Sequence, residues 1–260
     1  MKRILIIISI FCLSIYNVAR AQNMTQEAVY LVSNPQTARW SYIETDDSGK
    51  KIATVYNSVE SIEGDGINGK IKLCVDEVTV ASPKDTIRSF ISYRFEDGEC
   101  MVDMYAGFED NILEGKRIDS LVLNTIEKKQ PDLSEERKKE VFEKTKSQLI
   151  KISGETRGIP RYPKVGQLPD YEFHIKFSML SMTIIGKDRR IVGTERIQTE
   201  TGSYDCFIME ETISTKAMML KEVTKTRSWY AYGIGLVKES TYDKSGKLIS
   251  TITLNEIKRN

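Results

Sequence analysis

The residues best able to carry out chemistry in this sequence are few and scattered. The single histidine, His174, lies in the alternating stretch Tyr171–Phe177. Hydrolytic catalysis needs a nucleophile, a base and a group that orients the base, so we interpret His174 as a surface or half-buried strand residue. Asp103 and Glu109 lie beside aromatic residues but give no stronger indication of acid–base chemistry. An unrecognised hydrolase is therefore the least favoured class of function.

Methionines form two pairs that could in principle bind a soft metal ion. Met179 and Met182 are three positions apart, and Met218 is followed directly by Met219. Thioether sulfur suits Cu(I), but methionine more often fills an irregular apolar core or lines an adaptable pocket. One histidine and the absence of any CxxC spacing also argue against zinc. We predict no metal ion, no cofactor and no enzymatic activity.

The most distinctive glycine pair is Gly233-Ile-Gly235. A nucleotide-binding loop places its glycines between a strand and the start of a helix, whereas an alternating, strand-like stretch follows this pair. Simple alternation puts Trp229, Gly233 and Gly235 on one face of a β-strand. Glycines in a strand allow a neighbouring group to approach closely or the sheet to bend sharply. We therefore predict a structural strand motif formed by Trp229, Gly233 and Gly235, and the sequence leaves open whether a side chain or a ligand covers it.

The first 21 residues have the pattern of a signal peptide. Lys2 and Arg3 precede an apolar run over residues 4–15, and Ala19-Arg-Ala21 supplies a small-x-small cleavage site. The run is shorter than the roughly 20 apolar residues that span a bilayer. We predict cleavage between Ala21 and Gln22, with an uncleaved anchor or a buried strand as the alternative. The mature protein would be periplasmic or secreted and would have no transmembrane span.

The charge of the mature chain is nearly balanced. Without Lys2, Arg3 and Arg20, the 38 basic residues become 35, against 37 acidic ones, which gives a net charge of −2. The mixed stretch over residues 135–146 is the main concentration of charge. Nothing in this distribution favours an anionic partner, so we predict no binding to nucleic acid.

Export to an oxidising compartment would allow disulfides to form. Cys12 leaves with the signal peptide, and the odd number of cysteines that stay permits at most one internal disulfide. Strand alternation points Cys100 and Cys206 inward, whereas Cys74 shares its face with charged residues. We favour a Cys100–Cys206 disulfide, and three buried free thiols are the alternative.

Most of the mature chain has the pattern of β-strands. Short segments rich in Val, Ile, Thr and Tyr alternate between polar and apolar residues, and glycine-containing turns separate them. We predict a mainly β (α+β) fold, with a curled antiparallel sheet or half-barrel. The predicted strands cover residues 39–45, 52–58, 69–80, 87–95, 100–105, 172–185, 191–200, 203–214, 220–229 and 248–257.

One segment departs from this pattern. Residues 134–151 predict a surface helix, because Ser134 is a good N-cap and Lys146 suits the negative end of a helix. Residues 120–128 could form a shorter partner helix. We therefore predict one β-rich domain over residues 22–260 with a helical insertion at about 111–154. A connector that covers the sheet is favoured over a lid.

Two turns share a sequence pattern. Asp46-x-Ser-Gly-Lys-x-Ile-x-Thr54 matches Asp243-x-Ser-Gly-Lys-x-Ile-x-Thr251. Duplication of a β-unit would explain the match, and so would two hairpins that use the same turn chemistry, which is the favoured explanation.

The stretches Trp229–Lys238 and Tyr242–Leu248 resemble the C-terminal signature of a family of exported bacterial proteins of unknown function, the TapB-like family. The segments Val192–Glu195 and Gly202–Phe207 resemble the strand–turn–strand that precedes it. Such proteins are similar in plan to the curled sheets of lipoprotein carriers, which hold acyl chains on their concave face. The family has no established catalytic residues, so the resemblance implies none here.

These observations favour a non-catalytic periplasmic or envelope protein that binds a lipid or another hydrophobic ligand in a concave groove of its sheet. The alternative is an envelope scaffold or protein-interaction domain without a small ligand. An apolar cavity would favour the first, and an exposed apolar patch or edge strand would favour the second.

Overall fold

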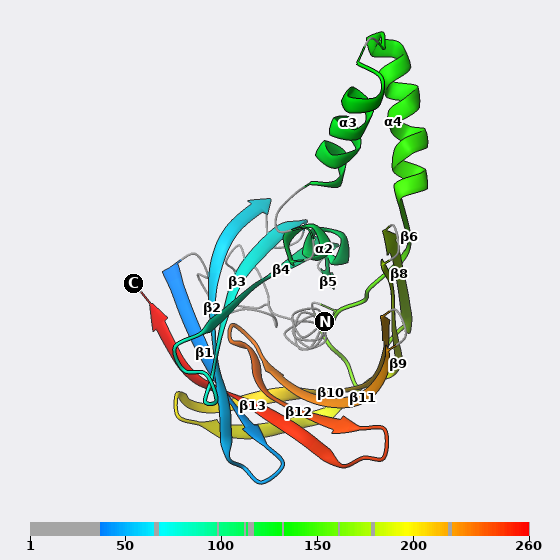
Figure 1. Ribbon diagram of the computed structural model, residues 1–260. Helices are drawn as coiled ribbons and strands as arrows, with labels where there is room; N and C mark the ends of the chain where they lie inside the picture. Colours follow the sequence, from blue (N-terminus) through cyan, green and yellow to red (C-terminus); the bar gives the residue numbers. More distant parts are fainter. Residues whose placement is uncertain are drawn as a thin grey trace.

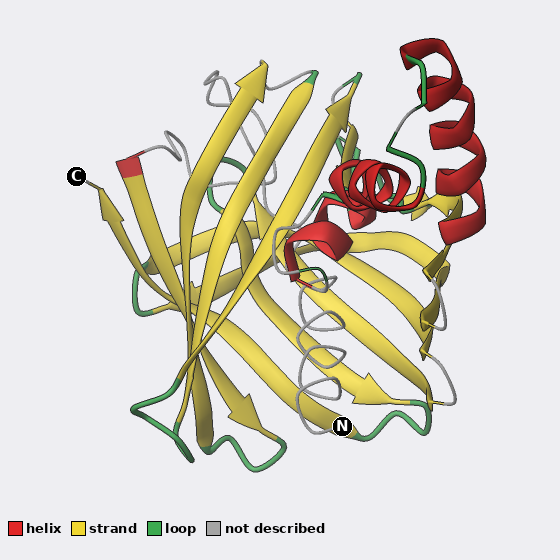
Figure 2. Cartoon of the chain, turned by 45° about the horizontal axis from the view of Figure 1, so that its top comes forward, coloured by secondary structure: helices red, strands yellow, loops and turns green. Residues whose placement is uncertain are grey.

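One large antiparallel sheet dominates the protein. The computed structural model describes residues 37–64, 68–97, 99–111, 113, 117–131, 133–160, 162–177, 180–217 and 220–259. Within these residues thirteen strands form a single sheet that curls around an interior, and three helices lie at one side of it (Figures 1 and 2). The predicted mainly β fold with a curled antiparallel sheet is confirmed.

The elements follow one another along the chain in two groups of strands separated by helices. The first strands are β1 (Ala38–Asp46), β2 (Lys51–Gly64), β3 (Gly69–Thr79), β4 (Thr86–Glu96) and β5 (Glu99–Val102). The helices are α2 (Met104–Asn111), α3 (Ile118–Lys129) and α4 (Glu135–Leu149). The later strands are β6 (Ile150–Glu155), β7 (Gly166–Gln167), β8 (Tyr171–Phe177), β9 (Leu180–Thr199), β10 (Gly202–Ala217), β11 (Leu220–Ala231), β12 (Gly235–Asp243) and β13 (Leu248–Arg259).

Two meanders are joined side by side. The strand order is β5-β4-β3-β2-β1-β13-β12-β11-β10-β9-β8-β6, with β7 paired to β9 beyond the end of β8. The antiparallel pair β1–β13 joins the meanders, and its register places Trp40 opposite Ile257. The edge strands β5 and β6 are not paired with each other, so the described sheet is curled but open.

The concave face of the sheet holds the main core. One cluster of buried side chains draws on β1, β3, β4, β5 and β9–β13 and includes Trp40, Leu73, Tyr93, Met209 and Leu254. Strands of both meanders can share a cluster only where they face each other across the inside of the curve. Because side chains alternate between the faces of a strand, this cluster defines which residues of each strand point inward.

The gap between the two edges is bridged by the segment that follows β6. The Thr156 hydroxyl donates to the carbonyl of Val102 at 2.7 Å. Gly158 passes so close to β5 that a Cβ at this position would lie 1.4 Å from the carbonyl oxygen of Cys100. Only glycine allows this backbone approach, and it attaches the free edge of β5 to the second meander.

The helices fill the space between the edges and extend beyond it. Phe108 of α2 and Val122 of α3 pack with Phe173 of β8 and Ile184 of β9 in a second core cluster. The helices α3 and α4 form a hairpin that projects away from the sheet (Figure 1). The predicted surface helix over 134–151 and its shorter partner are confirmed, but α4 projects from the sheet and does not cover it as predicted. Ser134 occupies the N-cap position, but its side chain makes no capping hydrogen bond.

Helix α2 was not expected from the sequence. The predicted strand over residues 100–105 ends at Val102, because Asp103 starts a helix there. Its carboxylate accepts the N–H of Ala106 at 3.0 Å, and its carbonyl accepts the N–H of Gly107 at 2.9 Å. The side chain therefore satisfies an amide that the helix itself cannot pair.

The glycine pair adopts a structure different from the one predicted. Gly233 and Gly235 do not lie within a continuous strand, because the chain turns at residues 232–234 between β11 and β12. Their φ angles are 68° and 86°, and the Ile234 N–H donates to the carbonyl of Ala231 at 3.2 Å. Left-handed backbone is costly for residues with a Cβ, so the glycines are there for the hairpin turn. No helix follows them, which agrees with the exclusion of a nucleotide loop.

The favoured Cys100–Cys206 disulfide is not present in the structure. Cys74, Cys100 and Cys206 are all buried, and none of them forms a disulfide. Cys100 lies on β5 in the concave cluster, whereas Cys206 lies on β10 in a separate cluster with Ile208 and Trp229. On β10, Met209 points into the concave cluster and Cys206 points to the other face. The thiols of Cys100 and Cys206 therefore lie on opposite faces of the sheet. Burial, with the nearby carboxylates of Asp205 and Glu195, raises the pKa of Cys206 to about 12.

The two turns with matching sequences have matching structures. Asp46 Oδ1 accepts the N–H groups of Ser48 and Lys50 at 2.9 and 3.0 Å. Asp243 Oδ1 accepts those of Ser245 and Lys247 at 2.8 and 3.0 Å. Such Asx turns are a common solution for a hairpin. The shared chemistry therefore explains the sequence match without requiring duplication.

Among the described residues, no helix is long and apolar enough to cross a membrane. The predicted cleavage site at Ala21 and Gln22 and the methionines Met179, Met218 and Met219 lie outside the described residues.

Candidate functional site

The concave face is the strongest candidate for a functional surface, because both meanders contribute to it. Its character changes along the strands. One end carries the start of β1, the end of β2, the start of β10 and the 232–234 turn. The other end carries the two Asp-x-Ser-Gly-Lys turns.

The first end is apolar and only partly covered. Partly buried hydrophobic side chains pack against the concave cluster there, among them Val59, Ile62, Phe207, Ile234 and Ile257. The Phe207 ring meets the Tyr232 ring edge to face, with centroids 5.1 Å apart. Half-exposed apolar side chains that continue directly into a core offer a contact surface for an apolar ligand.

Toward the opposite end, the concave face carries buried carboxyl groups. Glu44 of β1 and Glu239 of β12 lie opposite the same residue of β13, Ile252, so the three form one row across the sheet. Glu239 is only 3% exposed and accepts a hydrogen bond from Ser228 Oγ at 2.5 Å. A buried carboxyl is stable when it is neutral or fully paired.

Burial controls the protonation of this row. It raises the pKa of Glu239 well above its ordinary value, and the carboxyls of Glu211 and Glu44 add to the rise while the Ser228 hydroxyl opposes it. Burial also raises the pKa of Glu44, and it raises that of Glu77 together with the neighbouring charge of Glu44. Burial therefore shifts these carboxyl groups toward the neutral form, in which a carboxyl can both donate and accept hydrogen bonds.

Arg189 of β9 ends this polar region and is almost completely buried, at 1% exposure. Its Nε donates to Glu211 at 3.0 Å, and Nη1 donates to the carbonyl of Pro169 at 2.6 Å. Nη2 donates to the carbonyls of Arg157 and Gly158 at 2.9 and 2.6 Å. One guanidinium thus holds β9, β10 and the segment that bridges the sheet edges. These contacts indicate a structural role.

The candidate catalytic residues of the sequence do not converge. His174 of β8 contacts Glu172 and Thr183 at the surface, and its side chain is 44% exposed. Asp103 caps α2, and Glu109 accepts the backbone N–H of Ile118 at 2.8 Å at the start of α3. In the described part of the chain, no group of three or more His, Cys, Asp or Glu side chains is arranged to hold a metal ion.

Sequence reasoning missed Arg189, Glu211 and Glu239. Arg189-Arg190 and Glu210-Glu211 place two like charges next to each other in segments that otherwise alternate, so one member of each pair must point inward. That break in alternation could have indicated a buried charge in the sequence. For Glu239 the indication was weaker: a charged residue at an inward position of β12.

A single open antiparallel sheet, curled around an apolar interior and interrupted by a helical insertion between its edges, defines the class of fold. Two solved structures share it. One is from Bacteroides fragilis and is described as an exported protein with a YmcC-like fold; it is 15% identical, covers 89% of this chain and 100% of its own, and has a TM-score of 0.57. The other, described as a lipoprotein from Parabacteroides distasonis, is 16% identical, covers 89% and 99%, and has a TM-score of 0.57.

At the level of family, residues 127–254 match the model of a family described as DUF3108-like, from the end of α3 into β13. No curated protein matches the chain. At this level of identity, the two solved structures show the fold alone. The resemblance to exported proteins with a curled sheet is thus supported in its general form, and the TapB-like assignment is not confirmed.

Proposed function

We propose that this protein is an exported, non-catalytic binding protein of the cell envelope whose concave face takes up an apolar ligand such as a lipid acyl chain. The observation that carries the proposal is the partly covered apolar end of the concave face, where Val59, Ile62, Phe207 and Ile257 continue into the core. Buried apolar area is the main source of affinity for such ligands. The TapB-like resemblance adds the expectation of an exported protein.

Ligand content tests this proposal directly. We would express the full chain with its own N-terminus, purify it from the periplasm, and compare native mass spectra before and after organic extraction. An extractable apolar molecule is expected. The same sample gives the N-terminal residue, which we expect to be Gln22.

A matched pair of variants on β2 places the ligand. Val59 packs against the concave cluster, whereas Tyr56 lies on the opposite face and is 49% exposed. Val59→Glu should abolish uptake of a fluorescent fatty acid, and Tyr56→Glu should leave uptake unchanged. A wild-type protein that carries no apolar molecule and takes up no fatty acid would contradict the proposal.

A second candidate function rests on the projecting hairpin of α3 and α4. It extends away from the sheet (Figure 1), and Leu123 on α3 is 44% exposed. Such a projection suits contact with another envelope protein. Leu123→Glu, on the exposed side of α3, should then abolish cross-linking to that partner in cells while fatty-acid uptake persists. Unchanged cross-linking would exclude this role.

A further inference from the structure

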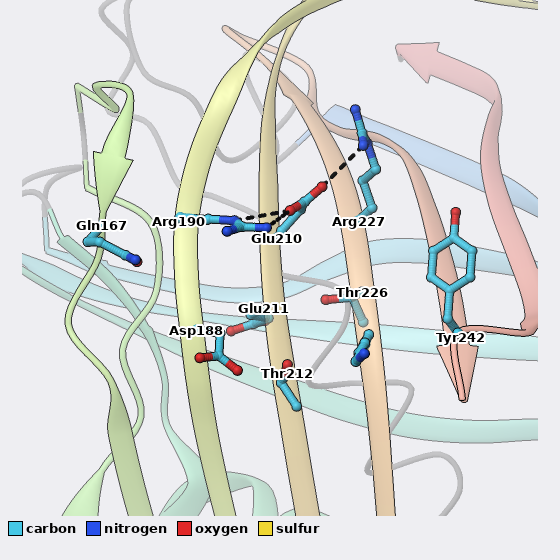
Figure 3. Close-up of a pocket in the computed structure, with 11 residues that line it drawn as sticks. Gln167, Asp188, Arg190, Glu210, Glu211, Thr212, Thr226, Arg227 and Tyr242 are labelled. Atoms are coloured by element: carbon cyan, nitrogen blue, oxygen red, sulfur yellow. Dashed lines mark hydrogen bonds and ion pairs between the residues drawn. The ribbon is translucent and has the colours of Figure 1, made fainter. Parts of the chain in front are cut away.

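The outer face of the sheet carries a separate hollow that the proposed lipid site does not use. Its volume is about 480 Å³, and it crosses β7, β9, β10 and β11 as far as the β12–β13 turn (Figure 3). This volume lies within the range of roughly 300 to 1,000 Å³ that is typical of small-molecule sites. We name it the outer trough and define it by Gln167, Asp188, Arg190, Glu210, Lys225, Arg227 and Tyr242.

A charged network at the centre of the outer trough holds its side chains in place. Arg190 Nε and Nη2 donate to Glu210 Oε2 at 3.1 and 2.8 Å. Arg227 Nη1 donates to the other oxygen, Oε1, at 3.1 Å. One carboxylate is therefore fixed between two guanidinium groups from the strands on either side (Figure 3). Coupled ion pairs of this kind are more rigid than an isolated surface pair.

The network still has unused hydrogen-bonding capacity. A guanidinium has five N–H groups, and the bonds to Glu210 use only some of them. Arg227 Nε is buried without a hydrogen-bond partner in the described residues. The Arg227 guanidinium also lies 5.5 Å from the centroid of the Trp229 ring, which supports it from the side. The Arg227 guanidinium is thus held in a fixed orientation.

The backbone beside the network is unusual. Asp188 has a φ of 55°, and the β9–β10 register shifts between Glu210 and Thr212. A left-handed non-glycine residue is costly, and bulges are over-represented at sheet edges and next to functional sites, where they re-aim side chains. Here the bulge turns Arg189 into the core and leaves its neighbour Arg190 in the trough.

The composition of the lining defines the chemistry of a ligand. It contains no aliphatic side chain, which disfavours a lipid. Three cationic residues of the outer trough (Arg190, Lys225, Arg227) lie beside two acidic ones (Asp188, Glu210), and this mixed charge disfavours a simple anion. What remains is a set of fixed planar donors and acceptors, with a tyrosine ring at one side.

From this arrangement we propose that the outer trough binds a saccharide. Adjacent sugar hydroxyls each donate and accept, so they match the paired N–H groups of a guanidinium and the paired oxygens of a carboxylate. The C–H face of a sugar ring can pack on the ring of Tyr242, which has an apolar body and a polar tip. A glycan of the cell envelope fits both requirements. This inference does not depend on a lipid in the concave face.

Saturation-transfer NMR on the purified full-length protein tests it with three probes: cellobiose, N,N′-diacetylchitobiose and digalacturonic acid. At least one should bind. Glu210→Gln should weaken binding about tenfold or more, because it releases both arginines from their fixed positions. Lys225→Met, at an exposed position, should also weaken binding, and it provides the test if Glu210→Gln does not fold.

The matched control is Arg196→Gln. Arg196 also lies on β9 and is an exposed arginine paired with an acid, Asp205, but it is outside the outer trough. Binding should be unchanged in this variant. The proposal fails if no probe binds, if all variants bind equally, or if inorganic phosphate binds in the trough and the sugars do not.

Discussion

Two arginines that are neighbours in the sequence have opposite environments. Arg189 is buried and donates to Glu211 and to three backbone carbonyls. Arg190 is about half exposed and pairs with Glu210. Removing one partner of a buried ion pair leaves a charge and several polar groups without compensation, whereas a surface pair contributes little.

We therefore expect Arg189→Met to lower the free energy of unfolding by about 3–5 kcal/mol. Arg190→Met should lower it by less than about 1 kcal/mol. Urea unfolding followed by circular dichroism measures both values. Equal losses in the two variants would show that the buried contacts of Arg189 do not hold β9, β10 and the bridging segment together.

The buried carboxyl of Glu239 should make stability depend on pH. Burial raises its pKa above the ordinary value of 4.5. The folded state then binds more protons than the unfolded state between these two pKa values. The contribution of Glu239 to stability is thus complete below about pH 4.5 and is lost as the pH rises through the folded-state pKa.

Glu239→Gln should remove this loss. The variant should gain stability relative to the wild type between pH 5 and pH 8, as measured by urea unfolding at both values. Glu222→Gln, at an exposed position of β11, is the matched control for the same substitution on the sheet. A stability difference between Glu239→Gln and the wild type that does not vary with pH would contradict the assignment.

At the level of elements, the twin turns permit a paired test. Gly49 and Gly246 have φ angles of 81° and 89°, and a Cβ at either position would meet no atom within 4 Å. Alanine at either site should therefore lower the free energy of unfolding only by the cost of a left-handed backbone for a residue with a Cβ, about 1–2 kcal/mol. This corresponds to a fall in melting temperature of about 2–8 °C.

Asparagine tolerates the left-handed region better than alanine. Gly246→Asn should thus lower the melting temperature less than Gly246→Ala in differential scanning fluorimetry. Equal losses for alanine and asparagine would point to a cause other than the backbone conformation.

The start of α3 depends on a side chain from α2. Glu109 accepts the Ile118 N–H at 2.8 Å and pairs with Arg117 at 2.8 Å, so it acts as the cap that Arg117 itself does not provide. Glu109→Ala should speed amide hydrogen exchange in residues 118–129. Exchange in β1 and β13 should stay the same, and faster exchange throughout the protein would instead indicate global destabilisation.

The sequence predicted those elements whose signals are local. Alternation located most of the strands, and the Ser134 region predicted α4. Alternation merged β8 with the start of β9, however, and it broke the long strand β9 into two. The same reasoning failed at Gly233 and Gly235. The alternating pattern of the sequence runs on without a break across the turn at residues 232–234, so it did not reveal that β11 ends and β12 begins there. It also missed α2, where one aspartate starts a helix in the middle of a strand-like segment.

Features that depend on strand register were not predictable. The outer trough requires Arg190, Glu210 and Arg227 to lie side by side, and those neighbours follow from the pairing of β9, β10 and β11. The Cys100–Cys206 disulfide was wrong for the same reason. The alternation within one strand shows which of its residues share a face. It does not show which residues of a distant strand lie on that same face of the sheet, because β-bulges shift the register between strands.

For the molecule as a whole, the contact at Gly158 decides whether the curled sheet stays closed across its gap. A side chain there would collide with the backbone of β5. Gly158→Ala should displace the bridging segment and expose Cys100, which is fully buried in the native protein. Its thiol should then react with Ellman's reagent under native conditions.

The double variant Gly158→Ala, Cys100→Ser identifies the reacting group. It should show no increase in thiol reactivity, because Cys74 and Cys206 lie away from the gap. A native-state reactivity of Gly158→Ala equal to that of the wild type would mean that the bridging segment does not protect β5.

The pairing of β1 with β13 has a consequence for the order of folding. Each meander can form from neighbouring hairpins as soon as its own residues emerge, but the seam between them closes a loop of about two hundred residues. Long-range closure of this kind is slow. Until residues 248–259 arrive, β1 and β12 each present an unpaired border, so a partly synthesised chain would need protection from association at those two borders.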